Sequence, residues 1–261
     1  MSNDTLSGGS GDDTIFGGIG DDVIMGGLGA DLMDGGADTD RLSYADATSR
    51  VVVDMLNGSV TGAFAAGDVF FNFENLEGGT ANDLLLGDNA ANVIYGGGDG
   101  DELQGRFGND TLIGGSGAAT LDGGGNVDTA SYETSNAAVN VNFFNGTALG
   151  GHAAGDVFNK VDNLIGSDFG DTLTGSCSNN QIEGGAGGDV LNGGAGTDTA
   201  SYASDTAGVT VSLDAGTASG GDAQGDTLSN FENLRGGSGN DALTGEGGTK
   251  NLRGGAGSYK L

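Results

Sequence analysis

The chain has 261 residues, of which 57 are glycine and none is proline, and its 37 acidic side chains outnumber 8 basic ones, for a formal net charge of −29. Only 36% of the residues are hydrophobic and 6% aromatic, which is too few large side chains for the thick core of a compact enzyme barrel. This charge repels nucleic acids and anionic lipids, and the apolar runs are far shorter than the ~20 residues of a membrane helix. We therefore expect cations as partners, no nucleic acid and no membrane insertion.

A nine-residue repeat begins at Gly8. Residues 8–16, 17–25 and 26–34 fit G-G-x-G-x-D-x-U-x, where U is a large apolar residue, and residues 35–43 depart from it only by Asp38 at the fourth position. Each nonamer supplies a glycine-rich loop and a short strand, so two nonamers complete one turn of a coil with a strand on each side. The apolar eighth residue is expected to point inward between two sheets, as for Ile15, Ile24, Met33 and Leu42.

Segments of a different kind separate the runs of nonamers. Each begins after a Ser-Tyr pair, and its tyrosine is followed at constant spacing by an aspartate and then by an asparagine; the three copies are Tyr44, Asp68 and Asn75, then Tyr132, Asp156 and Asn163, then Tyr202, Asp226 and Asn233. Alternating apolar residues, Val51, Val53 and Met55 in the first copy, predict a half-buried strand. We interpret these spacers as wider β rungs or as a small β insertion.

The sequence therefore predicts an all-β solenoid of repeat blocks and β spacer modules. The blocks span residues 1–44, 78–132, 166–202 and 236–261, and the spacers span 45–77, 133–165 and 203–235. The last block stops inside a repeat with Tyr259 at the sixth position, which predicts a fragment or a divergent terminal cap.

Aspartate at the sixth position of successive loops indicates a site for a hard cation, because carboxylates and exposed glycine carbonyls supply oxygen ligands. Calcium tolerates such a mixed and flexible ligand set better than magnesium, and zinc would need more than one histidine and one cysteine. We expect several Ca²⁺ ions. The candidate ligands are Asp4, Asp13, Asp22, Asp31, Asp40, Asp83, Asp101, Asp110, Asp128, Asp171, Asp189, Asp198 and Asp241.

Aspartates separated by two nonamers should face each other along one edge of the stack. The predicted sets are Asp4, Asp22 and Asp40 on one edge and Asp13 with Asp31 on the other, followed by Asp83 with Asp101, Asp110 with Asp128, and Asp171 with Asp189. Weak or empty sites are expected at Asn92, Ala119, Asn180 and Lys250, so that binding concentrates in the first two blocks. The spacer residues Asp68, Asp156 and Asp226 are either ligands or turn residues, whereas Asp12, Asp21, Asp34, Glu74 and Glu232 are expected to be solvated surface acids.

The repeated G-G-x-G-x-D-x-U-x units resemble the RTX (repeat-in-toxin, hemolysin-type) family of secreted bacterial calcium-binding proteins, and they cover somewhat over half of the chain. The resemblance implies a right-handed parallel β-roll with Ca²⁺ between adjacent turns. It also implies type I secretion as an unfolded chain and folding outside the cell when calcium is met. Carboxylate repulsion would keep the calcium-free chain open, and ion binding would supply folding free energy.

The leading hypothesis is thus a secreted, extracellular or cell-surface calcium-binding module with a structural or binding role, and not an enzyme. The alternative is a polysaccharide-binding accessory module of an extracellular carbohydrate-active enzyme. A cryptic hydrolase would need one spacer with distinctive acids or histidine, and His152 is its sole candidate; both His152 and Cys177 are expected to be non-catalytic. Exposed end rungs make self-association a further possible partnership.

Overall fold

The computed structural model describes residues 2–247 and 251–260, and it divides into two compact units. The first unit comprises residues 1–129 with 156–161, and the second comprises 130–155 with 162–261. Within the described residues the only helical segments are two 3-10 turns, η1 (Gly151–Ala153) and η2 (Gly221–Ala223), and no helix is long and apolar enough to cross a membrane. The predicted all-β parallel β-roll is confirmed, while the seven-segment division remains a prediction.

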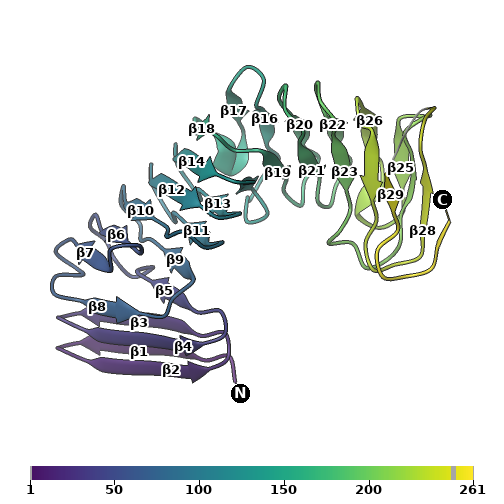
Figure 1. Cartoon of the computed structure of the whole chain (residues 1–261). Coiled ribbons are helices and arrows are strands. Elements are labelled where there is room, and N and C mark those ends of the chain that lie inside the picture. Colours follow the sequence, from purple (N-terminus) through teal and green to yellow (C-terminus); the bar gives the residue numbers. More distant parts are fainter. Residues whose placement is uncertain (1, 248–250, 261) are drawn as a thin grey trace. The chain divides into compact units, whose positions relative to one another are not determined.

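The first unit is a coil of short strands stacked as rungs (Figure 1). Its strands are β1 (Thr5–Ser10), β2 (Thr14–Ile19), β3 (Val23–Leu28), β4 (Leu32–Ala37), β5 (Arg41–Ser43), β6 (Val52–Asp54), β7 (Ser59–Thr61), β8 (Val69–Phe71), β9 (Asn75–Glu77), β10 (Leu84–Leu86), β11 (Val93–Tyr95), β12 (Glu102–Phe107), β13 (Thr111–Ile113), β14 (Thr120–Gly125) and β18 (Val157–Asn159). Successive strands alternate between two faces, so that β1 pairs with β3 and β2 pairs with β4.

The register of these parallel ladders confirms that two nonamers make one turn. Thr5 lies beside Val23 in one sheet, and Thr14 lies beside Leu32 in the other. A shift of two nonamers in the sequence is therefore one step along the stack, which brings equivalent loop residues of successive nonamer pairs directly next to each other. Proline would interrupt these ladders because it lacks the backbone N–H that each rung donates.

The first spacer contains both of the structures that the sequence left open. Its strands β8 and β9 are rungs of the coil, since Leu32 pairs with Val69 and Arg41 pairs with Asn75. Its strands β6 and β7 form an inserted antiparallel hairpin. One face continues across the spacer in the order β1-β3-β5-β9-β11-β13, whereas the other is interrupted: β2-β4-β8 ends, and the hairpin begins a new sheet, β7-β6-β10-β12-β14-β18.

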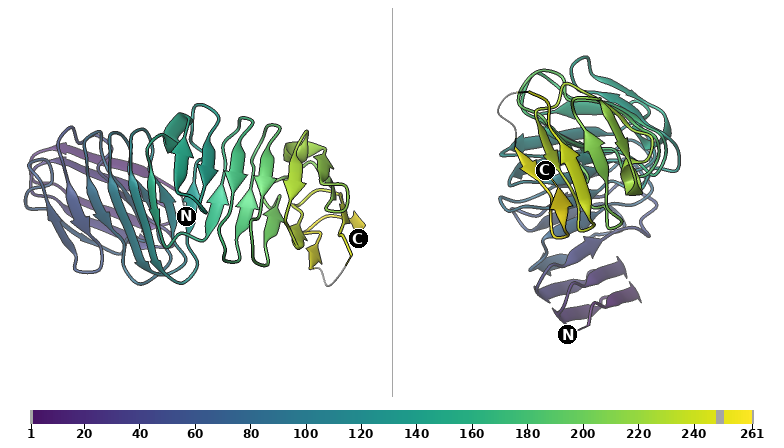
Figure 2. Two further views of the ribbon diagram at one scale, coloured as in Figure 1. Left: turned by 90° about the horizontal axis from the view of Figure 1, so that it is seen from above. Right: turned by 90° about the vertical axis from the view of Figure 1, so that its right-hand side faces the viewer.

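The second unit repeats this plan (Figure 2). Its strands are β16 (Asn140–Asn142), β17 (Thr147–Leu149), β19 (Asn163–Ile165), β20 (Thr172–Thr174), β21 (Gln181–Glu183), β22 (Val190–Asn192), β23 (Thr199–Ser201), β24 (Thr210–Ser212), β25 (Thr217–Ser219), β26 (Thr227–Ser229), β27 (Asn233–Arg235), β28 (Asp241–Thr244), β29 (Leu252–Arg253) and β30 (Tyr259–Lys260), and β15 (Thr129–Ser131) spans the boundary. One face is β19-β21-β23-β27-β29, and the opposite face contains two spacer hairpins, β16-β17 and β24-β25.

A thin column of apolar side chains fills the space between the faces. In the first unit, Ile24, Met33, Leu42, Leu76, Leu85, Ile94, Leu103, Leu112 and Leu121 are fully buried. Each such side chain contributes about 1.5–3 kcal/mol by leaving water. Ile15 is only half-buried, because its strand β2 is the terminal rung of its sheet. The predicted inward eighth position is otherwise confirmed, and it places the sixth position at the edges of the stack.

Candidate metal sites

Each predicted pair of aspartates lies in adjacent turns of the stack. In every pair the backbone N–H of the earlier aspartate donates to Oδ1 of the later one. The N···O distances are 2.7 Å for Asp4 and Asp22, 2.8 Å for Asp22 and Asp40, 2.9 Å for Asp13 and Asp31, 2.8 Å for Asp83 and Asp101, 2.9 Å for Asp110 and Asp128, and 2.8 Å for Asp171 and Asp189. The sixth-position carboxylates thus form columns along the edges of each unit.

The second oxygen of most of these carboxylates is buried and accepts no hydrogen bond within the described part of the chain. We call such a group an open carboxylate. The open carboxylates, each with a buried and unbonded Oδ2, are Asp13, Asp22, Asp31, Asp40, Asp101, Asp110, Asp189, Asp198 and Asp241. Leaving a buried charged oxygen without a donor is costly, so each open carboxylate needs either a proton or a cation.

Glycine at the first repeat position leaves room beside that oxygen. An ideal Cβ built on Gly96 would lie 2.5 Å from Asp101 Oδ2 and 2.5 Å from the carbonyl oxygen of Gly114 in the next turn. The same construction on Gly8 would lie 2.7 Å from Asp13 Oδ2 and 2.7 Å from the Gly26 carbonyl oxygen. A side chain would fill this cradle, whereas glycine leaves it lined by carboxylate and carbonyl oxygens.

Burial sets the electrostatics of the open carboxylates. Desolvation raises the pKa of Asp101 to about 7 and that of Asp189 to about 7, with smaller contributions from neighbouring acids. Burial likewise raises the pKa of Asp110 to about 6, helped by the charges of Asp128 and Asp88. These shifts express the cost of an uncompensated buried negative charge, which a divalent cation would remove.

The donor set fits calcium. The described residues contain no cluster of three or more His, Cys, Asp or Glu side chains that could hold a metal alone, so carbonyl oxygens must complete each ligand set. A mixture of carboxylate and carbonyl oxygens from two flexible loops suits Ca²⁺, which accepts six to eight oxygen ligands. At the level of Asp101, the groups that would hold the ion are its open carboxylate and the carbonyl of Gly114.

Three predicted ligands lie in different surroundings. Asp4 is exposed at the end of the stack, and its Oδ2 accepts a hydrogen bond from Ser2 Oγ at 3.0 Å. Asp83 Oδ2 accepts the Gly79 N–H at 2.7 Å. Asp171 Oδ2 accepts the Ser167 N–H at 2.5 Å and the Ser167 hydroxyl at 3.0 Å. Their second oxygens are therefore already engaged by the protein.

The nine-residue pattern does not reveal the roles of Glu74 and Glu232. The expectation that they are solvated surface acids is wrong, because both are half-buried and take the place of the next sixth-position carboxylate at a spacer. Glu74 Oε2 accepts the Asp40 N–H at 2.8 Å, and Glu232 Oε2 accepts the Asp198 N–H at 2.8 Å. A signal was present, since an acid stands immediately before the asparagine of each spacer, as Glu74, Asp162 and Glu232.

The remaining candidates lie away from the columns or outside the described residues. His152 is half-buried on η1, and its backbone N–H donates to Ser135 Oγ at 3.1 Å. Cys177 is an exposed free thiol. Asp12 and Asp21 are exposed, as expected. Lys250 and the side chain of Tyr259 lie outside the described residues.

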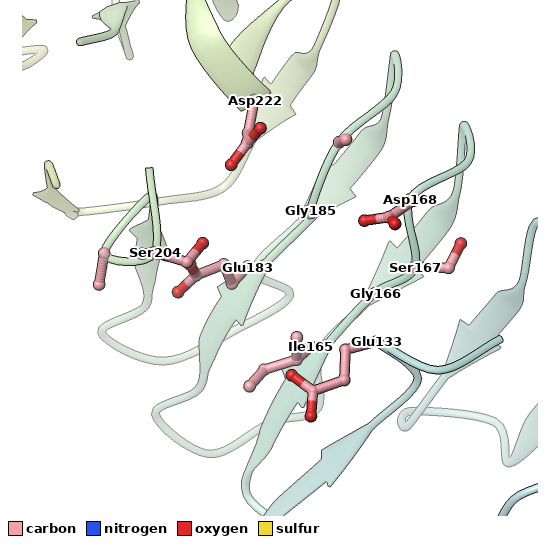
Figure 3. Close-up of a pocket in the computed structure, with 11 residues that line it drawn as sticks. Glu133, Ile165, Gly166, Ser167, Asp168, Glu183, Gly185, Ser204 and Asp222 are labelled. Atoms are coloured by element: carbon pink, nitrogen blue, oxygen red, sulfur yellow. The ribbon is translucent and has the colours of Figure 1, made fainter. Parts of the chain in front are cut away.

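An acidic cavity of about 520 Å³ in the second unit differs chemically from the columns (Figure 3). Glu133, Asp168, Glu183 and Asp222 line it. The oxygens of Glu183 accept hydrogen bonds from the hydroxyls of Ser201 at 2.7 Å and Ser204 at 2.5 Å. Its most buried carboxylate is thus satisfied by the protein, unlike the open carboxylates of the repeat loops.

Stacked parallel rungs with columns of buried carboxylates beside glycine carbonyls define the class of calcium-binding β-rolls. Comparison with known families agrees with this class. The family described as RTX calcium-binding nonapeptide repeat (4 copies) matches residues 2–33, 16–45, 73–103, 95–130, 165–200 and 225–261. The chain belongs to this family, and its repeats are calcium-binding repeats. No curated protein matches the sequence.

Proposed function

We propose that the chain is a non-enzymatic structural module of an extracellular protein, which folds when it binds several calcium ions. The observation that carries the proposal is the set of buried, unbonded Oδ2 atoms at equivalent loop positions of successive turns. A fold that depended on hydrogen bonds alone would supply donors to these oxygens. Family membership and the net charge of −29 support the same function.

The protein's own groups explain why calcium would decide between the folded and unfolded states. In each turn, the backbone N–H of one aspartate holds Oδ1 of the next, for example Asp22 on Asp40, and this orients the open Oδ2 toward the glycine cradle. Bound calcium supplies the positive charge that offsets carboxylate repulsion. Because the loops exist as a pair only in the coil, binding free energy is folding free energy.

The proposal includes secretion as an unfolded chain, with type I export as the route. Low cytosolic calcium would leave the acidic chain open before export, and millimolar extracellular calcium is in the range at which extracellular calcium modules bind. The high glycine content and the repulsion among 37 acidic side chains favour an open chain when no cation is present.

The test is a calcium titration of the full chain followed by far-UV circular dichroism, with magnesium at the same concentrations as the control. We expect a cooperative gain of β signal with calcium and little change with magnesium. A chain that is fully folded in calcium-free buffer and unchanged by calcium would contradict the proposal.

A further inference from the structure

At the spacers, a side chain of the protein binds the second oxygen of the carboxylate in the column, in contrast to the open carboxylates inside the blocks. Tyr44 is fully buried, and its hydroxyl donates to Asp68 Oδ2 at 3.1 Å. Asp68 Oδ1 accepts the Asp31 N–H at 3.0 Å. Asp68 therefore stands in the column where the next sixth-position aspartate would stand, but both of its oxygens are satisfied. The sequence left Asp68 as either a ligand or a turn residue, and this geometry shows that Asp68 is not an open carboxylate.

The second unit contains the same arrangement. The buried Tyr202 hydroxyl donates to Asp226 Oδ2 at 2.9 Å, and Asp226 Oδ1 accepts the Asp189 N–H at 2.9 Å. Burial is the main reason that the pKa of each tyrosine is raised, so the hydroxyl keeps the proton that it donates. The bond between the tyrosine hydroxyl and the aspartate is therefore present in two separate spacers.

An asparagine side chain links each of the first two spacers to the repeat block that follows it. Asn92 replaces the sixth-position aspartate in the loop between β10 and β11. Its Nδ2 donates to the Glu74 carbonyl oxygen at 2.7 Å, and its Oδ1 accepts the Asp88 N–H at 2.9 Å. In the second unit, Asn180 Nδ2 donates to the Asp162 carbonyl oxygen, and Asn180 Oδ1 accepts the Ser176 N–H at 2.6 Å. The amide thus bridges two turns without an ion.

A backbone carbonyl of the same loop is also bound by an arginine side chain. Arg106 Nη1 donates to the Gly87 carbonyl oxygen at 2.8 Å, and Gly87 is the first residue of the loop that contains Asn92. The guanidinium forms a bidentate pair with Asp54 of the spacer hairpin, with N···O distances of 2.7 and 2.8 Å. A repeat carbonyl is therefore bound by arginine here.

We propose that hydrogen-bond donors of the chain take the place of calcium at the spacers, so that the first spacer and its two flanking loops fold without calcium and template the calcium-dependent blocks. The proposal rests on the proposed calcium-dependent folding, and it limits the requirement for calcium to the blocks. The donors are the tyrosine hydroxyl, the asparagine amide and the arginine guanidinium. The departures at Asn92 and Asn180 are then functional substitutions, not decayed sites.

The first experiment is hydrogen–deuterium exchange by mass spectrometry on the full chain, in calcium-free buffer and in calcium. We expect peptides from residues 44–95 to stay protected without calcium, and peptides from residues 8–25 and 110–128 to gain protection only with calcium. If all peptides were unprotected without calcium and gained protection together, this inference would fail while the proposed function stood. If all were protected without calcium, the proposed function itself would fail.

The second experiment compares Tyr44→Phe with Tyr95→Phe as the matched control, because the described structure records no hydrogen bond from the half-buried Tyr95 hydroxyl. Tyr44→Phe leaves Asp68 Oδ2 unbonded, and we expect exchange of the 44–77 amides in calcium-free buffer to become about tenfold faster. Calcium should restore protection. Equal exchange in the two variants would overturn the inference.

Asn92→Asp restores the repeat consensus and serves as a variant of opposite design. It removes the amide donor to the Glu74 carbonyl and creates a carboxylate, so we expect the calcium-free spacer to lose protection and the calcium midpoint of folding to rise about tenfold. A midpoint and an exchange pattern identical to those of the parent chain would contradict the role assigned to Asn92.

Discussion

The first repeat block and the first spacer share one coil but differ in how their loops are joined. In the block, the aspartates Asp22 and Asp31 each have one oxygen bound to a neighbouring backbone N–H and one oxygen buried without a donor. In the spacer, Asp68 has the same backbone bond, and its second oxygen is bound by Tyr44. Backbone register therefore builds the stack, whereas the groups beside the second carboxylate oxygen decide whether a turn needs an ion.

The largest expected effect is that of pH on the calcium-free block. Because folding raises the pKa of Asp101 and Asp189 from 3.8 to about 7, the protonated carboxyls favour the folded state. This contribution is fully present below about pH 4 and is lost as the pH rises through 7. We expect the β signal of the calcium-free chain to be larger at pH 5 than at pH 8, as measured by far-UV circular dichroism.

Calcium should reverse this trend, because the ion binds the deprotonated carboxylates and its affinity rises over the same pH range. A β signal that rose with pH in calcium-free buffer would show that these carboxylates are stabilised by groups other than a cation.

Filling a glycine cradle should have the next largest effect. In Gly96→Ala the new Cβ would meet Asp101 Oδ2 and the Gly114 carbonyl, and we expect a loss of about 2 kcal/mol in the free energy of unfolding in calcium. Gly98→Ala is the matched control in the same loop, since its Cβ would lie 3.4 Å from the nearest atom, Thr80 Cα. Urea denaturation measures both, and equal losses would argue against a cradle.

Two isosteric substitutions test the open and the satisfied carboxylate directly. Asp31→Asn removes the charge of an open carboxylate, and we expect the calcium midpoint to rise about tenfold. Asp68→Asn removes the charge of a satisfied carboxylate, and we expect less than a twofold change, because the amide still offers an oxygen to the Asp31 N–H. Calcium titration by circular dichroism checks the pair. An equal response would erase the distinction between block and spacer.

The smallest expected effect concerns the ion pair of the spacer hairpin. Hydrogen bonds from Arg106 lower the pKa of Asp54 to about 2, and the pair is half-buried and bidentate. Asp54→Asn should lower the free energy of unfolding by about 1 kcal/mol. The loss should be the same with and without calcium, because no ion joins these groups. The exposed Asp214→Asn is the control, and a loss that appeared only in calcium would contradict this account.

Much of the fold could be predicted because local chemistry repeats. The nine-residue pattern predicted the strand positions, the turn of two nonamers and the aspartate pairs, since each follows from counting along Gly8 to Ser43. For the spacer, the sequence left two structures open, wider β rungs or a small β insertion. Alternating residues such as Val51 and Val53 predicted a strand, but its pairing with an antiparallel partner depends on tertiary contacts.

The candidate sites were predicted less completely. Glu74 has no place in the nonamer pattern, and it reaches the column only because β9 stacks on β5 across the first spacer. The constant spacing between Tyr44 and Asp68 was visible, but a spacing does not say that a hydroxyl meets a carboxylate.

The class of fold, the coil period and the placement of the sixth-position carboxylates follow from the amino-acid pattern, because a periodic pattern leaves a chain one way to bury its apolar eighth residues. Which carboxylates remain open, as Asp31 does, and which are satisfied, as Asp68 is, depends on how the turns stack. The physical reason is that this state depends on donors from other turns, such as the hydroxyl of Tyr44 and the amide of Asn92, whose contacts follow from stacking and not from local sequence.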